Sequence, residues 1–157
     1  MLEAVQNRIA ADPLLATRVH LLGEVPHEHV QQLMRAADVF VSGSHVEGSG
    51  YALIEALACG LLPVVTDIPS FRSLTREGRV GRLWACGDAE DLARALLEMG
   101  SRAHAPRRAE IRSFFDAELS FDCVGRALVA AYTQVLNLHD RASRASEAPV
   151  SDAAASH

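Results

Sequence analysis

Two glutamates, Glu47 and Glu55, stand eight positions apart in the stretch SGSHVEGSGYALIEALACG, residues 42–60. Glu55 lies inside an apolar helical pattern, and helical spacing places Ala52 and Cys59 beside it on one face. These small neighbours leave room for another group, and in a crevice the Glu55 carboxylate could accept two hydrogen bonds from a vicinal diol such as a ribose. On a solvent-facing surface Glu55 would be a solvated charge instead. The residues alone leave both interpretations open.

A glycine-rich segment, Gly48-Ser49-Gly50, separates a predicted strand from the helix that carries Glu55. Glycines let a ligand approach the backbone closely, and a helix N-terminus offers unpaired N–H groups and a positive dipole end. The segment therefore suits a phosphate group at the carboxyl end of a parallel strand, although a plain turn is the alternative. Glu47 beside it could cap the helix, which is its simplest role, or bind the hydroxyls of a sugar.

Other phosphate-binding motifs are excluded. No lysine follows the glycines, so the segment is not a Walker A loop, and Leu53 stands where the dinucleotide fingerprint needs its third glycine. The run His27-Glu28-His29 lacks the spacing of a zinc protease motif and is expected to be exposed. No convincing metal cluster is present in the sequence.

The elements that position these residues form an alternating pattern. Short β-branched runs alternate with helical patterns, which is typical of parallel βαβ units. We therefore predict an α/β fold, a Rossmann-like parallel sheet with flanking helices and a helical C-terminal end. The predicted strands are 18–22, 38–41, 62–65 and 81–85, and the predicted helices are 1–11, 27–35, 51–59, a short one after Pro69, 92–99 with Asp88 as its N-cap, 106–115 and 120–138.

The chain has the size and composition of one soluble domain. We expect residues 1–138 to form one folded domain and the small polar stretch 139–157 to be disordered. The net charge of −5 offers no basic surface for nucleic acid. No apolar run reaches the roughly 18 residues of a membrane span, and peripheral membrane contact stays open. Three widely spaced cysteines, odd in number, indicate free thiols in a cytoplasmic setting: Cys59, Cys86 and Cys123.

Several segments together resemble a known family. The E-x7-E signature of group 1 (family 4) glycosyltransferases resembles one stretch of this sequence, Glu47-Gly48-Ser49-Gly50-(x4)-Glu55-Ala56-Leu57-Ala58-Cys59-Gly60-(x2)-Pro63-Val64-Val65. The segments VHLLGEV (19–25), AADVFV (36–41) and GRL (81–83), and the helix 88–99, follow the order of that family as well. The resemblance covers roughly residues 15–100.

The resemblance implies that residues 1–138 form the nucleotide-sugar-binding Rossmann-like domain of a retaining GT-B enzyme, its donor-binding half, without the first strands of that domain. Glu55 would hold the ribose hydroxyls of a nucleotide-diphosphate sugar, and Glu47 would contact the transferred sugar as the catalytic residue. The backbone around Gly50, Tyr51 and Ala52, with Gly48 and Ser49 before it, would receive the diphosphate, and Leu22-Gly23 would lie beside the base. Transfer in this family needs no metal and no further cofactor.

The sequence departs from the family in three places. Ser49 replaces a usual aromatic residue, and Gly43 stands where a proline is common. By this resemblance the chain would also start after the two strands that carry an arginine and a lysine for the diphosphate in the family, and it would lack the acceptor-binding N-terminal domain. We therefore expect weak or absent activity from this chain alone, and a need for an N-terminal GT-B domain or an oligomeric partner. The alternative is a non-catalytic remnant or an interaction module whose partner completes the sheet.

Overall fold

The computed structural model describes residues 2–100 and 104–146, and within them it forms a small parallel sheet covered by helices. The strands are β1 (Val39–Ser42), β2 (Leu62–Thr66) and β3 (Arg82–Trp84), in the order β1-β2-β3. Both pairings are parallel: Val39 lies opposite Leu62, and Val64 lies opposite Arg82. The predicted α/β class with a parallel sheet is confirmed.

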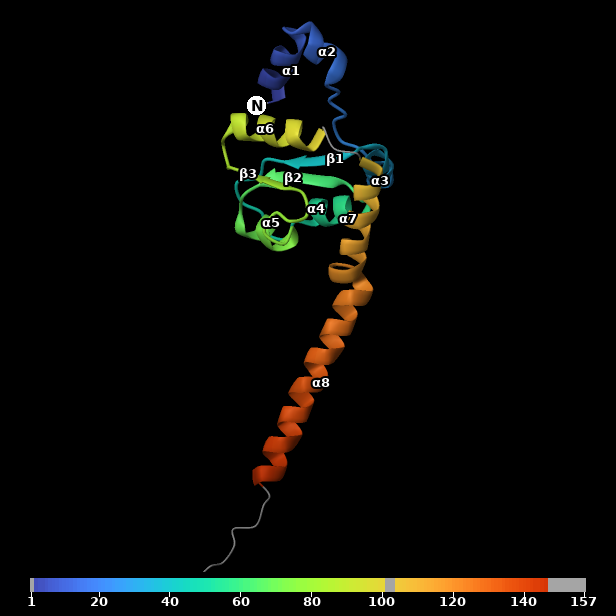
Figure 1. Ribbon diagram of the computed structural model, residues 1–157, viewed down its shortest axis with the longest axis vertical. Helices are drawn as coiled ribbons and strands as arrows, with labels where there is room; N and C mark the ends of the chain where they lie inside the picture. The colour runs from blue at the N-terminus through green and yellow to red at the C-terminus, as the bar shows by residue number, and fades with distance from the viewer. Residues whose placement is uncertain (1, 101–103, 147–157) are drawn as a thin grey trace, which may run out of the picture.

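Helices cover both faces of this sheet. Figure 1 shows α6 on one face, with α4 and α5 on the other, and α7 beside α4. The described helices are α1 (Leu2–Ala10), α2 (Pro13–Arg18), α3 (His27–Ala36), α4 (Tyr51–Ala58), α5 (Pro69–Leu74), α6 (Ala89–Gly100), α7 (His104–Glu118) and α8 (Phe121–Ser146).

The central strand β2 carries the core. All five of its residues are buried, as its continuous apolar run predicts for a strand covered on both faces. The Asp88 carboxylate accepts hydrogen bonds from the N–H groups of Glu90 and Asp91, both at 3.0 Å. The predicted role of Asp88 as the N-cap of α6 is therefore confirmed. Most of the remaining buried apolar residues come from the helices and β3, among them Leu53, Leu57, Phe71, Trp84, Ala95, Met99 and Ile111.

The predicted strand at residues 18–22 is wrong. Arg18 ends α2 instead, and residues 19–26 form neither helix nor strand. The helix begins because the Asp12 carboxylate accepts the N–H of Leu14 at 2.9 Å and Pro13 has the backbone angle of a first helical residue. A strand also needs a neighbour for its backbone hydrogen bonds, and in the described chain β1 pairs only with β2.

The last helix extends away from the rest of the molecule (Figure 1). α8 continues to Ser146, past its predicted end at residue 138, so the first part of the predicted disordered tail is helical and residues 147–157 lie outside the described chain. Its large apolar side chains are exposed, among them Phe121 at 97% and Tyr132 at 68%. No helix of the described residues is both long and apolar enough to cross a bilayer.

Candidate functional site

The loop between β1 and α4 places Glu47 against the start of the helix. Glu47 Oε1 accepts the N–H of Gly50, the N-cap residue of α4, at 3.2 Å, so Glu47 fixes the turn before the helix but caps none of the N–H groups of the helix itself. The second carboxylate oxygen has no protein partner within the described residues. One oxygen of Glu47 therefore fixes the helix start, while the other stays available to a ligand.

Gly50 turns the chain into α4, and its type is required twice. Its φ of +66° is a left-handed conformation, which residues with a Cβ adopt only at an energetic cost. A Cβ on Gly50 would also lie 2.5 Å from Cδ1 of Leu74, so α5 packs directly against this backbone. The sequence therefore brings glycine here for the turn as well as for close approach.

The first turn of α4 leaves backbone donors unused. The N–H groups of Tyr51, Ala52 and Leu53 have no acceptor in the described chain, whereas the N–H of Ile54 bonds to the Gly50 carbonyl at 3.0 Å. Tyr51 and Ala52 are exposed, as are Gly48 and Ser49, whereas Gly50 and Leu53 are buried, so the approach is open at Tyr51 and Ala52. Unpaired N–H groups at the positive end of a helix can bind an anion.

The sheet holds the other side of this loop. The Thr66 hydroxyl donates to the Ser44 carbonyl at 2.5 Å, and a Cβ on Gly43 would meet the Trp84 ring at 3.6 Å. Sequence reasoning missed Thr66 and Trp84. No motif marks them, because their contact with the loop depends on β1, β2 and β3 lying side by side in parallel register.

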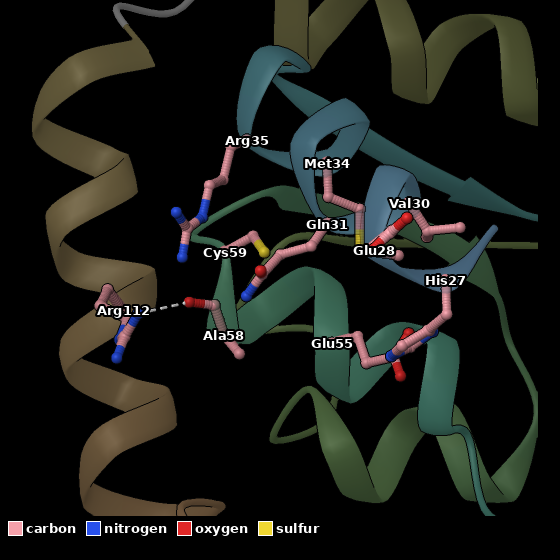
Figure 2. Close-up of a pocket in the computed structure, with 10 residues that line it drawn as sticks. All are labelled: His27, Glu28, Val30, Gln31, Met34, Arg35, Glu55, Ala58, Cys59 and Arg112. Carbon is pink, nitrogen blue, oxygen red and sulfur yellow. Dashed lines mark hydrogen bonds between the residues drawn. The ribbon is translucent and has the colours of Figure 1, made fainter. Parts of the chain in front are cut away.

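Glu55 lies one turn further along α4, at the wall of a pocket. The pocket has a volume of about 360 Å³ and runs between α3, α4 and α7 (Figure 2). Figure 2 shows His27 and Glu55 at one end, with Arg35 and Arg112 at the other. Glu55 is partly buried, which corresponds to the crevice setting rather than the fully solvated one. The residues that line the pocket are His27, Glu28, Val30, Gln31, Met34, Arg35, Glu55, Ala58, Cys59 and Arg112.

Leu22 and Gly23 stand apart from this lining. Leu22 is 59% exposed, and Gly23 turns the chain with a φ of +68° in the segment between α2 and α3. Neither residue is among those that line the pocket. The structure thus brings together Glu47, Gly50 and Glu55 on one loop and helix, and leaves the predicted base-side segment outside the pocket wall.

The far end of α4 is closed by protein groups. The N–H of Leu61 bonds to the Ala56 carbonyl and that of Gly60 to the Leu57 carbonyl, both at 2.9 Å, which is a Schellman motif around a left-handed glycine. Arg112 donates to the Ala58 carbonyl at 2.7 Å.

A second arginine of α7 closes the end of the neighbouring helix. Arg108 donates to the Arg35 carbonyl at 2.9 Å and also to the Ala37 carbonyl. Because α3 and α4 both end at these bonds, α7 links the C-terminal ends of the two helices that border the pocket.

The cations after β2 are engaged with internal partners. Arg72 pairs with Asp67, and the hydrogen bond and charge of that carboxylate raise the pKa of Arg72 above its ordinary value. Arg76 pairs with Glu118. His27 and His29 are exposed, and residues 2–100 and 104–146 contain no group of three His, Cys, Asp or Glu side chains that could hold a metal ion.

Comparison with curated proteins finds several glycosyltransferases. The chain is 36% identical over 86 residues to the phosphatidyl-myo-inositol mannosyltransferase of Mycobacterium leprae, which covers 54% of this chain and 23% of that relative. It is 32% identical over 174 residues to the D-inositol 3-phosphate glycosyltransferase of Geodermatophilus obscurus, covering 85% of this chain and 36% of the relative. It is 35% identical over 79 residues to the GDP-mannose:cellobiosyl-diphosphopolyprenol alpha-mannosyltransferase of Xanthomonas oryzae pv. oryzae, covering 50% and 21%.

These relatives are much longer than the matched region, since the chain spans between 21% and 36% of their lengths. The profile of the family described as glycosyl transferases group 1 matches residues 4–112, which include the β1–α4 loop, all of α4 and the three strands. The chain therefore belongs to the group 1 glycosyltransferase family.

Proposed function

We propose that this chain binds the nucleotide-diphosphate sugar in a retaining glycosyl transfer of the GT-B kind, using the loop and first turns of α4. The observation that carries the proposal is the set of three unused N–H groups at Tyr51, Ala52 and Leu53, followed on the same helix by Glu55. Glu55 follows Tyr51 by four positions of helix, about 6 Å along the axis. That separation suits a diphosphate at the helix end and a ribose beside it.

Each group then has a distinct role. The free N–H groups bind the diphosphate, and the positive end of α4 stabilises the negative charge that grows on it as the sugar leaves. Glu55 accepts hydrogen bonds from the ribose hydroxyls at the wall of the pocket. Glu47, whose Oε2 is unpartnered, contacts the hydroxyls of the transferred sugar. The backbone around Gly48 and Ser49 borders the diphosphate.

The acceptor has no assigned place among these residues. We propose that it is bound by polypeptide outside the 157 residues, either an N-terminal GT-B domain or an oligomeric partner, and that the reaction is cytoplasmic and uses no metal. The greater length of the curated relatives supports the first of these points, the presence of further polypeptide. The exposed apolar side chains of α8, such as Leu128 and Val135, offer a surface for such a contact.

The same exposed surface favours a second candidate, a non-catalytic module that associates with a partner. β1 supports it as well, because one of its edges has no neighbouring strand in the described sheet. The two candidates differ in one respect, since only the first requires a nucleotide to bind at α4.

The test is ligand-observed NMR on the full chain with GDP, UDP, ADP and their sugars. We expect saturable binding of one nucleotide, weakened about tenfold or more by Glu55→Gln, because hydrogen bonds to a charged acceptor are worth roughly 1.5–3 kcal/mol. The control is Glu90→Gln, an exposed residue of α6 on the opposite face of the sheet. Absence of binding by a folded chain would contradict the donor role and favour the association module.

A further inference from the structure

A buried hydroxyl lies below the loop that carries Glu47. Thr66 ends the apolar strand β2 and has 0% of its surface exposed, and Thr75 is the other fully buried threonine among the described residues. A buried hydroxyl destabilises the fold unless it forms a hydrogen bond. Thr66 forms its bond with the Ser44 carbonyl, 22 positions earlier in the chain.

This bond is one of two attachments that fix the loop around Glu47. Ser44 lies three residues before Glu47, and the bond between Glu47 and Gly50 is the attachment on the other side. Between them His45 is exposed and Val46 is 88% exposed, so neither side chain anchors the loop. The position of the Glu47 carboxylate therefore depends on a carbonyl that Thr66 holds.

The sheet also fixes the backbone just before this bond. Gly43 lies beside the Trp84 ring, which an added Cβ would meet at 3.6 Å, and the hydroxyls of Ser42 and Ser44 are 3.2 Å apart. Thr66 and Trp84 are register partners on β2 and β3, so the loop rests on two neighbouring strands. A rigid base of this kind restrains Ser44, and the restraint passes along only three residues to Glu47.

We infer that Thr66 is a positioning residue that fixes Glu47 toward the transferred sugar, so that Thr66 governs affinity for the sugar part of the donor and not for its nucleotide part. This inference rests on the proposed function of Glu47. Thr66 itself touches no ligand in this arrangement. It acts through the Ser44 carbonyl, and the nucleotide contacts at Tyr51, Ala52 and Glu55 lie on α4, beyond the second attachment.

The first measurement needs no ligand. Amide hydrogen exchange on the full chain would compare wild type with Thr66→Val, which removes the hydroxyl but keeps the shape, and with Thr66→Ser, which keeps it. We expect Gly50 exchange to accelerate roughly threefold to tenfold in Thr66→Val, from the usual worth of one hydrogen bond, and to stay near wild type in Thr66→Ser. Thr75→Val is the matched control, because Thr75 bonds to Phe71 and Gly78 instead of the loop.

The second measurement compares affinities for GDP and GDP-mannose, or for the UDP or ADP pair if the nucleotide panel selects one of these. Thr66→Val should weaken binding of the nucleotide sugar by the same factor, roughly threefold to tenfold, and leave the affinity for the nucleotide unchanged. Thr66→Ser should bind both ligands as wild type does. An equal loss for both ligands, or a Gly50 exchange rate that does not change, would overturn the positioning role. If wild type binds neither ligand, the proposed function fails, and the exchange rate of Gly50 alone decides the role of Thr66.

Discussion

The two ends of α4 differ in how their backbone groups are satisfied. At the N-terminal end three N–H groups have no acceptor in the described chain, and Gly48 and Ser49 before them are exposed. At the C-terminal end Gly60 and Leu61 donate back into the helix, and Arg112 reaches the Ala58 carbonyl. One short helix therefore has an end left open to a ligand and an end closed by the protein.

On the proposed function, the two ends of this eight-residue helix therefore have different tasks, ligand binding at one end and stability at the other. A helix end needs partners for its free backbone groups, and α7 supplies these partners at one end only. We therefore expect changes at the closed end to lower the free energy of unfolding without altering nucleotide affinity. Changes at the open end should alter nucleotide affinity more than stability.

The largest loss of stability is expected at the closed end, from Gly60→Ala. Gly60 has a φ of +76°, and a Cβ would lie 2.6 Å from Cγ and 2.9 Å from the carbonyl oxygen of Arg108. The strained backbone and the overpacking together should lower the free energy of unfolding by about 3 kcal/mol in urea denaturation. Gly125→Ala is the control, because a Cβ there meets nothing within 4 Å. A loss no larger than in that control would mean that α7 does not pack against Gly60 as described.

A smaller loss of stability but a larger loss of binding is expected from Gly50→Ala. The φ of +66° disfavours alanine by about 1–2 kcal/mol, and the nearest atom, Cδ1 of Leu74, belongs to a flexible side chain that can move. The displaced turn would move the N–H groups of Tyr51 and Ala52 away from the diphosphate. Titration of the folded variant with the nucleotide tests this, beside Gly125→Ala on α8, where an added Cβ meets nothing within 4 Å. Unchanged affinity would remove the functional difference between the two ends.

The smallest effect is expected from Arg108→Met, which keeps most of the alkyl chain and removes the donors to Arg35 and Ala37. Because this side chain is partly exposed, the free energy of unfolding should fall by only about 1 kcal/mol. Nucleotide affinity should stay the same. The measurement is urea denaturation beside Arg126→Met, an exposed arginine of α8. A drop in affinity would show that the closed end contributes to the site after all.

Much of the fold was predictable from local patterns. The apolar run of β2, the glycine after α4 and the Asp88 cap each specify their element through residues close in sequence, and the structure confirms all three. The strand expected at residues 18–22 failed for a non-local reason. Its β-branched and apolar residues suit a strand, but a strand forms only where it pairs with another, and this segment does not pair with the free edge of β1 in the described sheet.

The candidate site divides in the same way. The spacing of Glu47 and Glu55 and the glycines before α4 were visible in the sequence, because loop and helix are contiguous. Thr66 was not, because its contact with Ser44 exists only once the strands align. The arginines of α7 were likewise hidden, since their acceptors are main-chain carbonyls, which every residue has.

The reach of Arg108 has a consequence for how the protein is made. Its acceptors at Arg35 and Ala37 precede it by 73 and 71 positions. A ribosome adding about 5–20 residues per second needs roughly 4–15 seconds to cover that distance, whereas a helix forms within about a microsecond. During synthesis the carbonyls of Arg35 and Ala37, at the junction of α3 and β1, therefore lack these hydrogen bonds for several seconds. That interval is when a chaperone has its best access to the nascent sheet.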